Sequence, residues 1–128
     1  MKKVLLTAAA VTLAGAAMSA RRVVLMEQAT NGGCGCAGIL DPGMDSLFVR
    51  YGHEAIVCIR YNDDHPWAYD ELYAYNPTQI DARIAYYPMP TMPTLVIDGE
   101  LSERVCDANS LPEKFEQRFT VPSPLVMT

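Results

Sequence analysis

The segment from residue 23 to 61 constrains the fold of this 128-residue chain more than any other. It opens with the apolar run Val23 to Met26, which is typical of a strand covered on both faces of a sheet. Apolar residues then recur at spacings of three and four from Ala37 to Tyr51, which predicts an amphipathic helix. Ala55 to Tyr61 predicts a second buried strand. This order favours two parallel strands joined by a right-handed crossover, and therefore an α/β fold.

The second half of the chain adds two helices and a hairpin to this pattern. A helix is predicted from Pro77 to about Tyr86, with proline in its first turn. Thr94 to Ile97 predicts a short strand, Asp98-Gly99 a hairpin turn, and Leu101 to Val105 an antiparallel return strand. A capping box at Ser110-Leu-Pro-Glu113 opens a further helix. The elements predict one domain around a central mixed sheet, mainly parallel and flanked by helices.

The first 20 residues have the pattern of a secretory signal peptide. Lys2 and Lys3 supply the positive start, Val4 to Ala17 form an apolar run, and Met18-Ser19-Ala20 is a small-residue exit. We expect cleavage after Ala20. The alternative is an uncleaved N-terminal anchor, since the apolar run approaches the roughly 20 residues that span a bilayer.

Three regions are therefore expected: a signal peptide at 1–20, one domain at 21–120, and a tail at 121–128 that runs into a strand without a partner. The mature protein is expected to be exported, to the periplasm, the outer-membrane region or the extracellular space. Removing the two leader lysines from the 10 basic residues leaves 8 against 15 acidic ones, a formal charge of −7. This charge argues against nucleic acid and anionic membranes as partners, and no stable membrane insertion is expected after cleavage.

Four cysteines in an exported chain allow three complete disulfide pairings. Cys34 and Cys36 follow a glycine loop and stand where the first helix begins. A thiol at a helix N-terminus faces unpaired amide hydrogens and the positive end of the helix dipole, which favours the thiolate. Cys34 is therefore the expected nucleophile. Cys58 is expected to be a plain buried hydrophobe, and Cys106 to pair with Cys58 or to remain free.

A strand, a glycine loop, a cysteine pair at a helix start and a later Xaa-Pro-Thr before a strand and hairpin together resemble the thioredoxin-like superfamily. The stretches VVLMEQATNGGCGCAG, ARIAYY, MPTLVIDG and VPSPL are similar to a bacterial family of exported and outer-membrane-associated thioredoxin-like proteins. The resemblance covers nearly all of residues 22 to 125. It implies a thioredoxin-like fold and a thiol-disulfide oxidoreductase or isomerase-like activity on protein thiols and disulfides. In that family β-rich sequence follows VPSPL, so the chain would be an incomplete copy with a weakly packed tail from Thr120.

The same resemblance implies the site residues Cys34, Cys36 and Pro93, with no cofactor and no metal. In this fold family the proline before the third main strand is cis and lies against the active disulfide, and Pro93 in Met92-Pro93-Thr94 matches it. A Cys34–Cys36 disulfide would close a very small ring, so it is expected to be strained and easily reduced.

The usual motif is Cys-Xaa-Xaa-Cys, whereas this chain has Cys34-Gly35-Cys36-Ala37, and two registers are possible. With a gap, Cys36 remains the resolving thiol. Without a gap, Ala37 takes the place of the resolving cysteine, Cys36 points away, and Cys34 acts as a single thiol forming mixed disulfides. The helix proline of thioredoxins falls eight residues after the first cysteine and five after the second. Pro42 falls eight after Cys34 and six after Cys36, which favours the ungapped register.

Two features of the motif are replaced in this chain. Gly33 stands where the motif often has tryptophan, and Gln28 where many thioredoxins keep a buried carboxylate as proton acceptor. Glu27 is adjacent, but in a strand it should point to the opposite face. These replacements leave open a thioredoxin-fold binding or structural module without redox activity.

Soft-metal binding is the minor alternative, because thiolates two residues apart can chelate Cu(I). Met26, Met89 and Met92 are the thioethers expected near such a site.

Overall fold

The computed structural model describes residues 18–89, 91–104, 106–123 and 126–127. Most of the expected signal peptide, residues 1–17, lies outside this described part. None of the helices in the described ranges is both long and apolar enough to cross a bilayer.

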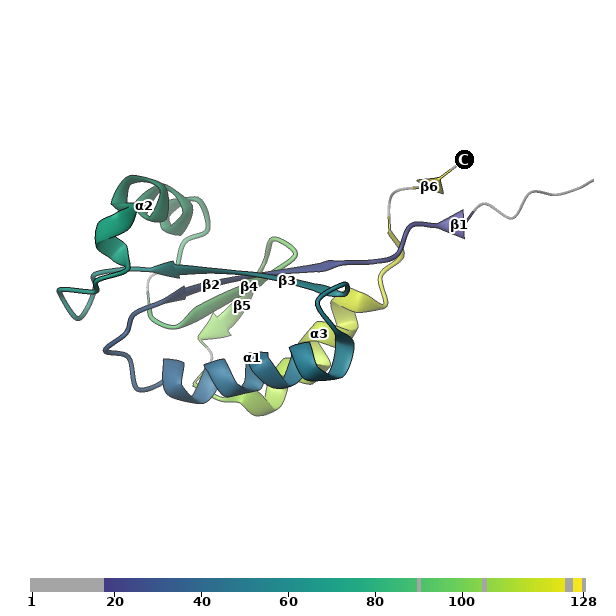
Figure 1. The fold of residues 1–128 in the computed structure, drawn as a ribbon, viewed down its shortest axis with the longest axis horizontal. Helices are drawn as coiled ribbons and strands as arrows, with labels where there is room; N and C mark the ends of the chain where they lie inside the picture. Colours follow the sequence, from purple (N-terminus) through teal and green to yellow (C-terminus); the bar gives the residue numbers. More distant parts are fainter. Residues whose placement is uncertain (1–17, 90, 105, 124–125, 128) are drawn as a thin grey trace, which may run out of the picture.

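A four-stranded sheet forms the centre of the molecule (Figure 1). Its strands are β2 (Val24–Thr30), β3 (Ile56–Asn62), β4 (Thr94–Ile97) and β5 (Glu100–Arg104), in the order β3-β2-β4-β5. β2 runs parallel to β3, whereas β4 is antiparallel to both β2 and β5. The predicted mixed sheet is therefore confirmed, but a mainly parallel sheet is wrong, because β4 enters between β2 and β5 with the opposite direction.

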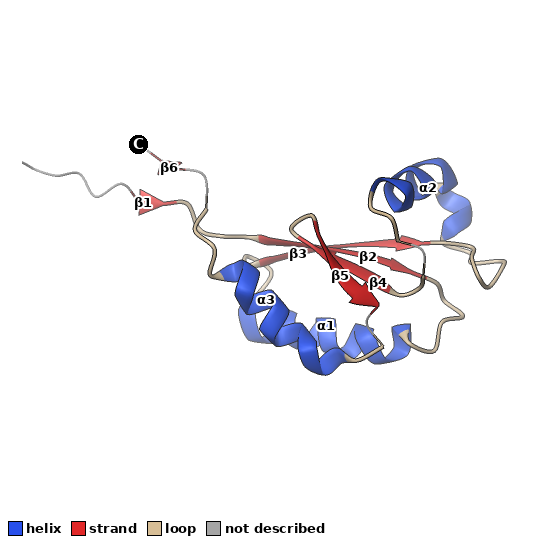
Figure 2. Ribbon diagram, turned by 180° about the vertical axis from the view of Figure 1, so that it is seen from behind, coloured by secondary structure: helices blue, strands red, loops and turns tan. Residues whose placement is uncertain are grey.

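Helices cover both faces of this sheet (Figures 1 and 2). α1 (Ala37–Tyr51) and α3 (Leu111–Phe119) lie on one face, and α2 (Pro77–Tyr86) lies on the other. The bounds predicted for α1, α2 and β4 are confirmed. Short 3-10 helices, η1 (Tyr73–Tyr75) and η2 (Ala108–Ser110), precede α2 and α3.

The alternation of side chains along the strands separates two apolar cores. The larger lies between the sheet and the α1 and α3 helices, and its buried members include Val24, Met26, Leu40, Met44, Leu47, Leu95, Ile97, Leu111 and Phe115. The smaller core is Ala29, Cys34, Ala37, Met89, Met92 and Val96, with Ile84 and Tyr87 packed against it. The first cysteine of the pair therefore belongs to the core that faces α2.

The capping box predicted at Ser110 is wrong. Ser110 has helical backbone angles, φ −80° and ψ −12°, and its side chain makes no cap hydrogen bond. The chain already turns helically at η2, where the Asp107 carboxylate accepts a hydrogen bond from the Asn109 N–H at 2.8 Å. The residue that caps with its side chain is therefore Asp107, three residues before Ser110, and the helix that it caps is η2.

The tail contains a two-residue strand, β6 (Val126–Met127), which pairs antiparallel with β1 (Met18–Ser19). The expectation of a tail strand without a partner is therefore wrong for the chain that still carries residues 18 and 19. Cleavage after Ala20 would remove β1, so the pairing belongs to the uncleaved chain.

Candidate thiol site

Cys34 lies in the loop between β2 and α1, and the buried side chain of Asn31 shapes that loop. Asn31 Nδ2 donates to the carbonyls of Asp63 at 2.6 Å and Trp67 at 2.9 Å. Its Oδ1 accepts from the Gly33 N–H at 2.7 Å. One amide side chain thus joins the Cys34 loop to the segment that follows β3.

Asp70 makes a second connection between the same two segments. Its carboxylate accepts hydrogen bonds from the Gly32 N–H at 2.7 Å, Asn62 Nδ2 at 3.0 Å and the Leu72 N–H at 2.9 Å. Burial alone would raise the pKa of Asp70, but these donors outweigh it and hold the pKa below its usual range. The carboxylate therefore stays ionised and fixes the loop.

Trp67 fills the space beside the residue that precedes Cys34. A Cβ atom on Gly33 would lie 3.2 Å from both Cβ and Cγ of Trp67. Such contacts are tight, so a larger residue here would require Trp67, from the β3–α2 connection, to shift by a few tenths of an ångström. The sequence has glycine where the motif often has tryptophan, and the position of Trp67 beside it depends on the Asn31 and Asp70 contacts, which are distant in sequence.

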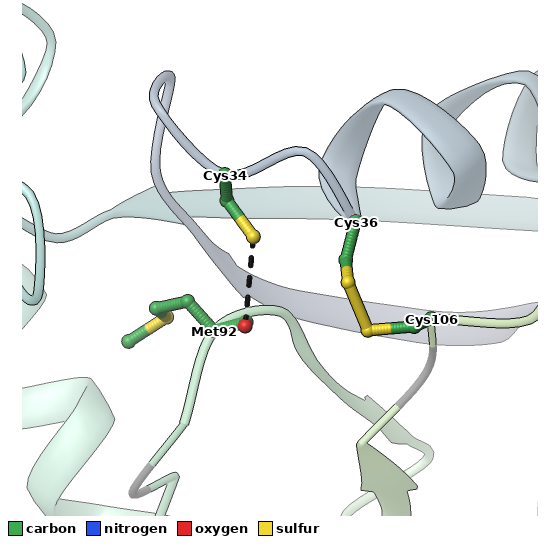
Figure 3. Close-up of a disulfide and its surroundings, with 4 residues drawn as sticks. All are labelled: Cys34, Cys36, Met92 and Cys106. Carbon is green, nitrogen blue, oxygen red and sulfur yellow. Dashed lines mark hydrogen bonds between the residues drawn. A yellow bond between two sulfur atoms is a disulfide. The ribbon is translucent and has the colours of Figure 1, made fainter.

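The Cys34 side chain points from its loop toward the chain segment before β4 (Figure 3). Its Sγ donates a hydrogen bond to the Met92 carbonyl at 3.5 Å, and the residue is only 5% exposed. The Met92–Pro93 peptide bond is cis, as expected. The structure thus brings Cys34 to the residue immediately before Pro93.

Cys36 is bonded to Cys106, with a Cα–Cα distance of 4.8 Å, and Cys34 and Cys58 are free. The expected Cys34–Cys36 disulfide is therefore not formed in this structure. The expectation that Cys106 pairs with Cys58 or stays free is wrong.

Sheet topology explains this pairing. β3, which carries Cys58, and β5 lie at opposite edges of the sheet. Because β5 is antiparallel to β4, its last residue, Arg104, pairs with Thr94 next to the cis proline. The chain therefore delivers Cys106 to the start of α1, far from Cys58.

Cys36 already has helical backbone angles, φ −69° and ψ −27°, and its carbonyl accepts from the Leu40 N–H at 3.0 Å. Its side chain is directed to Cys106 and not to Cys34 (Figure 3). This geometry favours the ungapped register, in which Cys34 is a single thiol.

The side chains of Glu27 and Gln28 point to opposite faces, as expected for neighbours in a strand. Gln28 faces α1 and donates from Nε2 to Asp41 at 3.0 Å. Glu27 faces α2, where Arg83 binds it in a bidentate pair at 2.6 and 2.9 Å and the Tyr61 hydroxyl donates to it at 2.8 Å. Burial would raise the pKa of Glu27, but these partners outweigh it and lower the pKa. Glu27 is thus an ionised anchor for α2.

Two of the three methionines expected near the site are there. Met89 and Met92 pack in one cluster with Cys34, whereas Met26 lies in the other core, across the sheet.

A cleft of about 410 Å³ borders the Cys34 loop, lined by Thr30, Asn31, Gly32, Cys34, Gly35, Ala37, Gly38, Asp41, Arg60, Asn62 and Leu72. A Cβ atom on Gly35 or Gly38 would meet no other atom within 4 Å. The backbone on either side of Cys36 is therefore bare, which allows another polypeptide to approach the loop closely.

Comparison with known proteins gives structural neighbours only. No family model matches the chain, and no curated protein matches its sequence. A mutant thioredoxin from Halobacterium salinarum NRC-1 is similar with a TM-score of 0.52 and 20% identity, over 78% of each chain. Mitochondrial thioredoxin 3 from Saccharomyces cerevisiae, in its oxidized form, has a TM-score of 0.51 and 15% identity, over 76% of this chain and 80% of its own. Fasciola hepatica thioredoxin has a TM-score of 0.53 and 16% identity, over 77% of this chain and 83% of its own. The chain has a thioredoxin-like α/β fold.

Proposed function

We propose that this chain is an exported thioredoxin-like domain in which Cys34 is a single nucleophilic thiol that exchanges disulfides with protein substrates. One observation carries the proposal. Cys34 is a free thiol beside the cis Met92–Pro93 bond, while Cys36 is occupied by Cys106. The fold supports a thiol-disulfide oxidoreductase-like role. The Cys36–Cys106 disulfide limits that role to chemistry that uses Cys34 as the reactive thiol.

The chemistry that fits one free thiol is isomerisation. The Cys34 thiolate attacks one sulfur of a substrate disulfide, so that a mixed disulfide forms and the other substrate sulfur leaves as a thiolate. A substrate thiolate then attacks the mixed disulfide and releases Cys34. Electrons balance without an external oxidant or reductant, since one disulfide is exchanged for another. Cys36 cannot resolve the mixed disulfide while it is bonded to Cys106.

Access to Cys34 requires a local adjustment. The residue is 5% exposed and its thiol donates to the Met92 carbonyl. A substrate strand that approaches along the bare backbone at Gly35 and Gly38 would displace this hydrogen bond. A neutral thiol-to-carbonyl bond is weak, so its loss is a small cost compared with formation of a covalent bond.

The burial of Cys34 also favours a second candidate, a binding module without redox turnover. In that case the Cys36–Cys106 bond is structural, and Gln28 in place of a buried carboxylate reflects lost proton transfer. Cu(I) binding by Cys34 with Met89 or Met92 is a third, minor candidate, because sulfur ligands suit that ion.

Reactivation of a test protein with scrambled disulfides distinguishes these candidates. We expect the wild-type chain to accelerate recovery, Cys34→Ser to abolish the acceleration, and Cys58→Ser, the matched control, to retain it. Equal recovery with wild type and Cys34→Ser would favour the binding module. Stoichiometric Cu(I) binding under reducing conditions that is lost in Cys34→Ser would favour the metal carrier.

Export is tested separately by the mass of the secreted chain. Cleavage after Ala20 predicts an N-terminus at Arg21 in the periplasmic or culture fraction. An intact leader on a membrane-bound chain would instead indicate the uncleaved anchor.

A further inference from the structure

Three of the four cysteines gather at one place, although they come from separate parts of the sequence. Cys34 is in the loop before α1, Cys36 is the N-cap residue of α1, and Cys106 follows β5. We propose that Cys106 is a third redox residue, and that internal exchange moves the disulfide between Cys36–Cys106 and Cys34–Cys36. The inference rests on the proposed nucleophilic role of Cys34, and it adds Cys106 as a second cysteine that takes part in the same chemistry.

The packing of Cys34 and Cys36 supports this exchange. Cys34 is buried in the smaller core, and Cys36 packs against that same cluster. Figure 3 shows Cys34 Sγ turned to the Met92 carbonyl and Cys36 Sγ bonded to Cys106. Attack on Cys36 Sγ would therefore require the Cys34 side chain to leave the Met92 carbonyl first.

The covalent step is balanced within the chain. The Cys34 thiol loses its proton to solvent, and its thiolate attacks Cys36 Sγ. The Cys34–Cys36 bond forms as the Cys36–Cys106 bond breaks, and Cys106 leaves as a thiolate that takes up a proton. The number of disulfides does not change, so no oxidant or reductant is needed. Reversal restores free Cys34.

The remaining cysteine is excluded from this exchange by its position. Cys58 lies in β3, where it contacts the larger core and borders an open surface pocket with Phe48, His53 and Arg60. Burial raises the pKa of the Cys58 thiol, which reduces its thiolate fraction at neutral pH. Cys58→Ser is therefore a matched control that leaves the three-sulfur cluster intact.

Exchange would convert the site between two forms. With Cys36–Cys106 bonded, Cys34 is free and suited to isomerisation. With Cys34–Cys36 bonded, the site presents a disulfide that a substrate thiol can attack, and Cys106 holds the free thiol. Cys106 would thus determine whether the domain meets its substrates as a thiol or as a disulfide.

Disulfide mapping tests the proposal on the chain purified without reductant. The protein is incubated at neutral pH, quenched with acid, alkylated in denaturant and digested with trypsin. Residues 23–50 form one tryptic peptide that contains both Cys34 and Cys36, so their disulfide is read as that peptide lacking two hydrogens. We expect wild type and Cys58→Ser to contain a fraction with this closed peptide and alkylated Cys106.

In Cys34→Ser, alkylation of Cys106 should fall to background, because nothing can displace it from Cys36. In Cys106→Ser treated with glutathione disulfide, the closed 23–50 peptide should predominate. The proposal is overturned if Cys106 is labelled no more in wild type than in Cys34→Ser. Separate glutathionylation of Cys34 and Cys36 in Cys106→Ser would also overturn it. If Cys106→Ser does not fold, the first comparison decides alone.

The outcome is independent of the scrambled-substrate assay. A wild-type chain that reactivates the substrate but shows no labelled Cys106 would retain the proposed function and refute the exchange. A chain that shows the exchange but no reactivation would refute the proposed function alone.

Discussion

Substitution of Arg83 by methionine tests how α2 is held beside the thiol site. The Glu27 side chain is about 1% exposed, and Arg83 binds it through two hydrogen bonds of 2.6 and 2.9 Å. Methionine keeps the apolar stem but removes the positive charge, leaving the carboxylate with the Tyr61 hydroxyl as its donor. Breaking one side of a buried ion pair costs roughly 3–5 kcal/mol. Because Arg83 is one third exposed and water can enter, we expect a loss of about 3 kcal/mol at neutral pH.

The loss should depend on pH. In wild type the pKa of Glu27 is lowered, so its contribution to stability is present above the usual carboxyl pKa and disappears as pH falls through the folded value. In Arg83→Met, burial dominates and raises the pKa of Glu27, so the variant takes up a proton more readily. The difference between the two proteins should therefore narrow from neutral toward acidic pH.

Urea unfolding of both proteins at several pH values measures this difference. Arg21→Met is the matched control, because its pair with Glu54 is 3.4 Å long and both side chains are 62% exposed. Such an exposed pair contributes about 0–1 kcal/mol. A loss below about 1 kcal/mol for Arg83→Met, or a loss that does not change with pH, would refute this account of α2.

Three further substitutions test the disulfide and the packing of α1. Cys106→Ser should lower the free energy of unfolding by about 2–4 kcal/mol, since the disulfide closes a separation of 70 residues. Reductant should lower the free energy of unfolding of wild type by a similar amount and have a smaller effect on the variant. Gly43→Ala should destabilise by about 1–3 kcal/mol, because its Cβ would lie 2.6 Å from the Cβ of Ala108. Gly38→Ala, on the same helix with open space around it, should instead stabilise by up to about 1 kcal/mol, and a thermal melt that reverses this order would contradict the packing.

Local sequence patterns were enough for most of the fold. Helical spacing predicted α1, and the Asp98-Gly99 turn predicted the hairpin of β4 and β5. Both turn residues have positive φ, 51° and 81°, as such a turn requires. These elements are determined by residues close in sequence, which is why the chain itself reveals them.

The disulfide could not be read in the same way, because it depends on contacts that are distant in sequence. Cys36 and Cys106 meet only because β4 enters the sheet antiparallel to β2 and β5 then returns beside it. Because Cys34 and Cys36 are two residues apart, the sequence favoured Cys34 as the disulfide partner of Cys36, whereas the partner is Cys106. The position of Trp67 could not be predicted for a related reason. The buried Asn31 side chain hydrogen-bonds both the Trp67 carbonyl and the Gly33 N–H, and this contact is distant in sequence.

The rate of alkylation of Cys34 tests the central claim most directly. Only the thiolate reacts with iodoacetamide, so the rate reports the nucleophile that the proposed function requires. The measurement uses mass mapping over time on the native chain, with Cys58 as internal reference and Cys34→Ser as blank. We predict that Cys34 is alkylated faster than Cys58 and faster than free cysteine, although it is only 5% exposed. A Cys34 that is alkylated no faster than free cysteine would contradict the account and leave a binding module in its place.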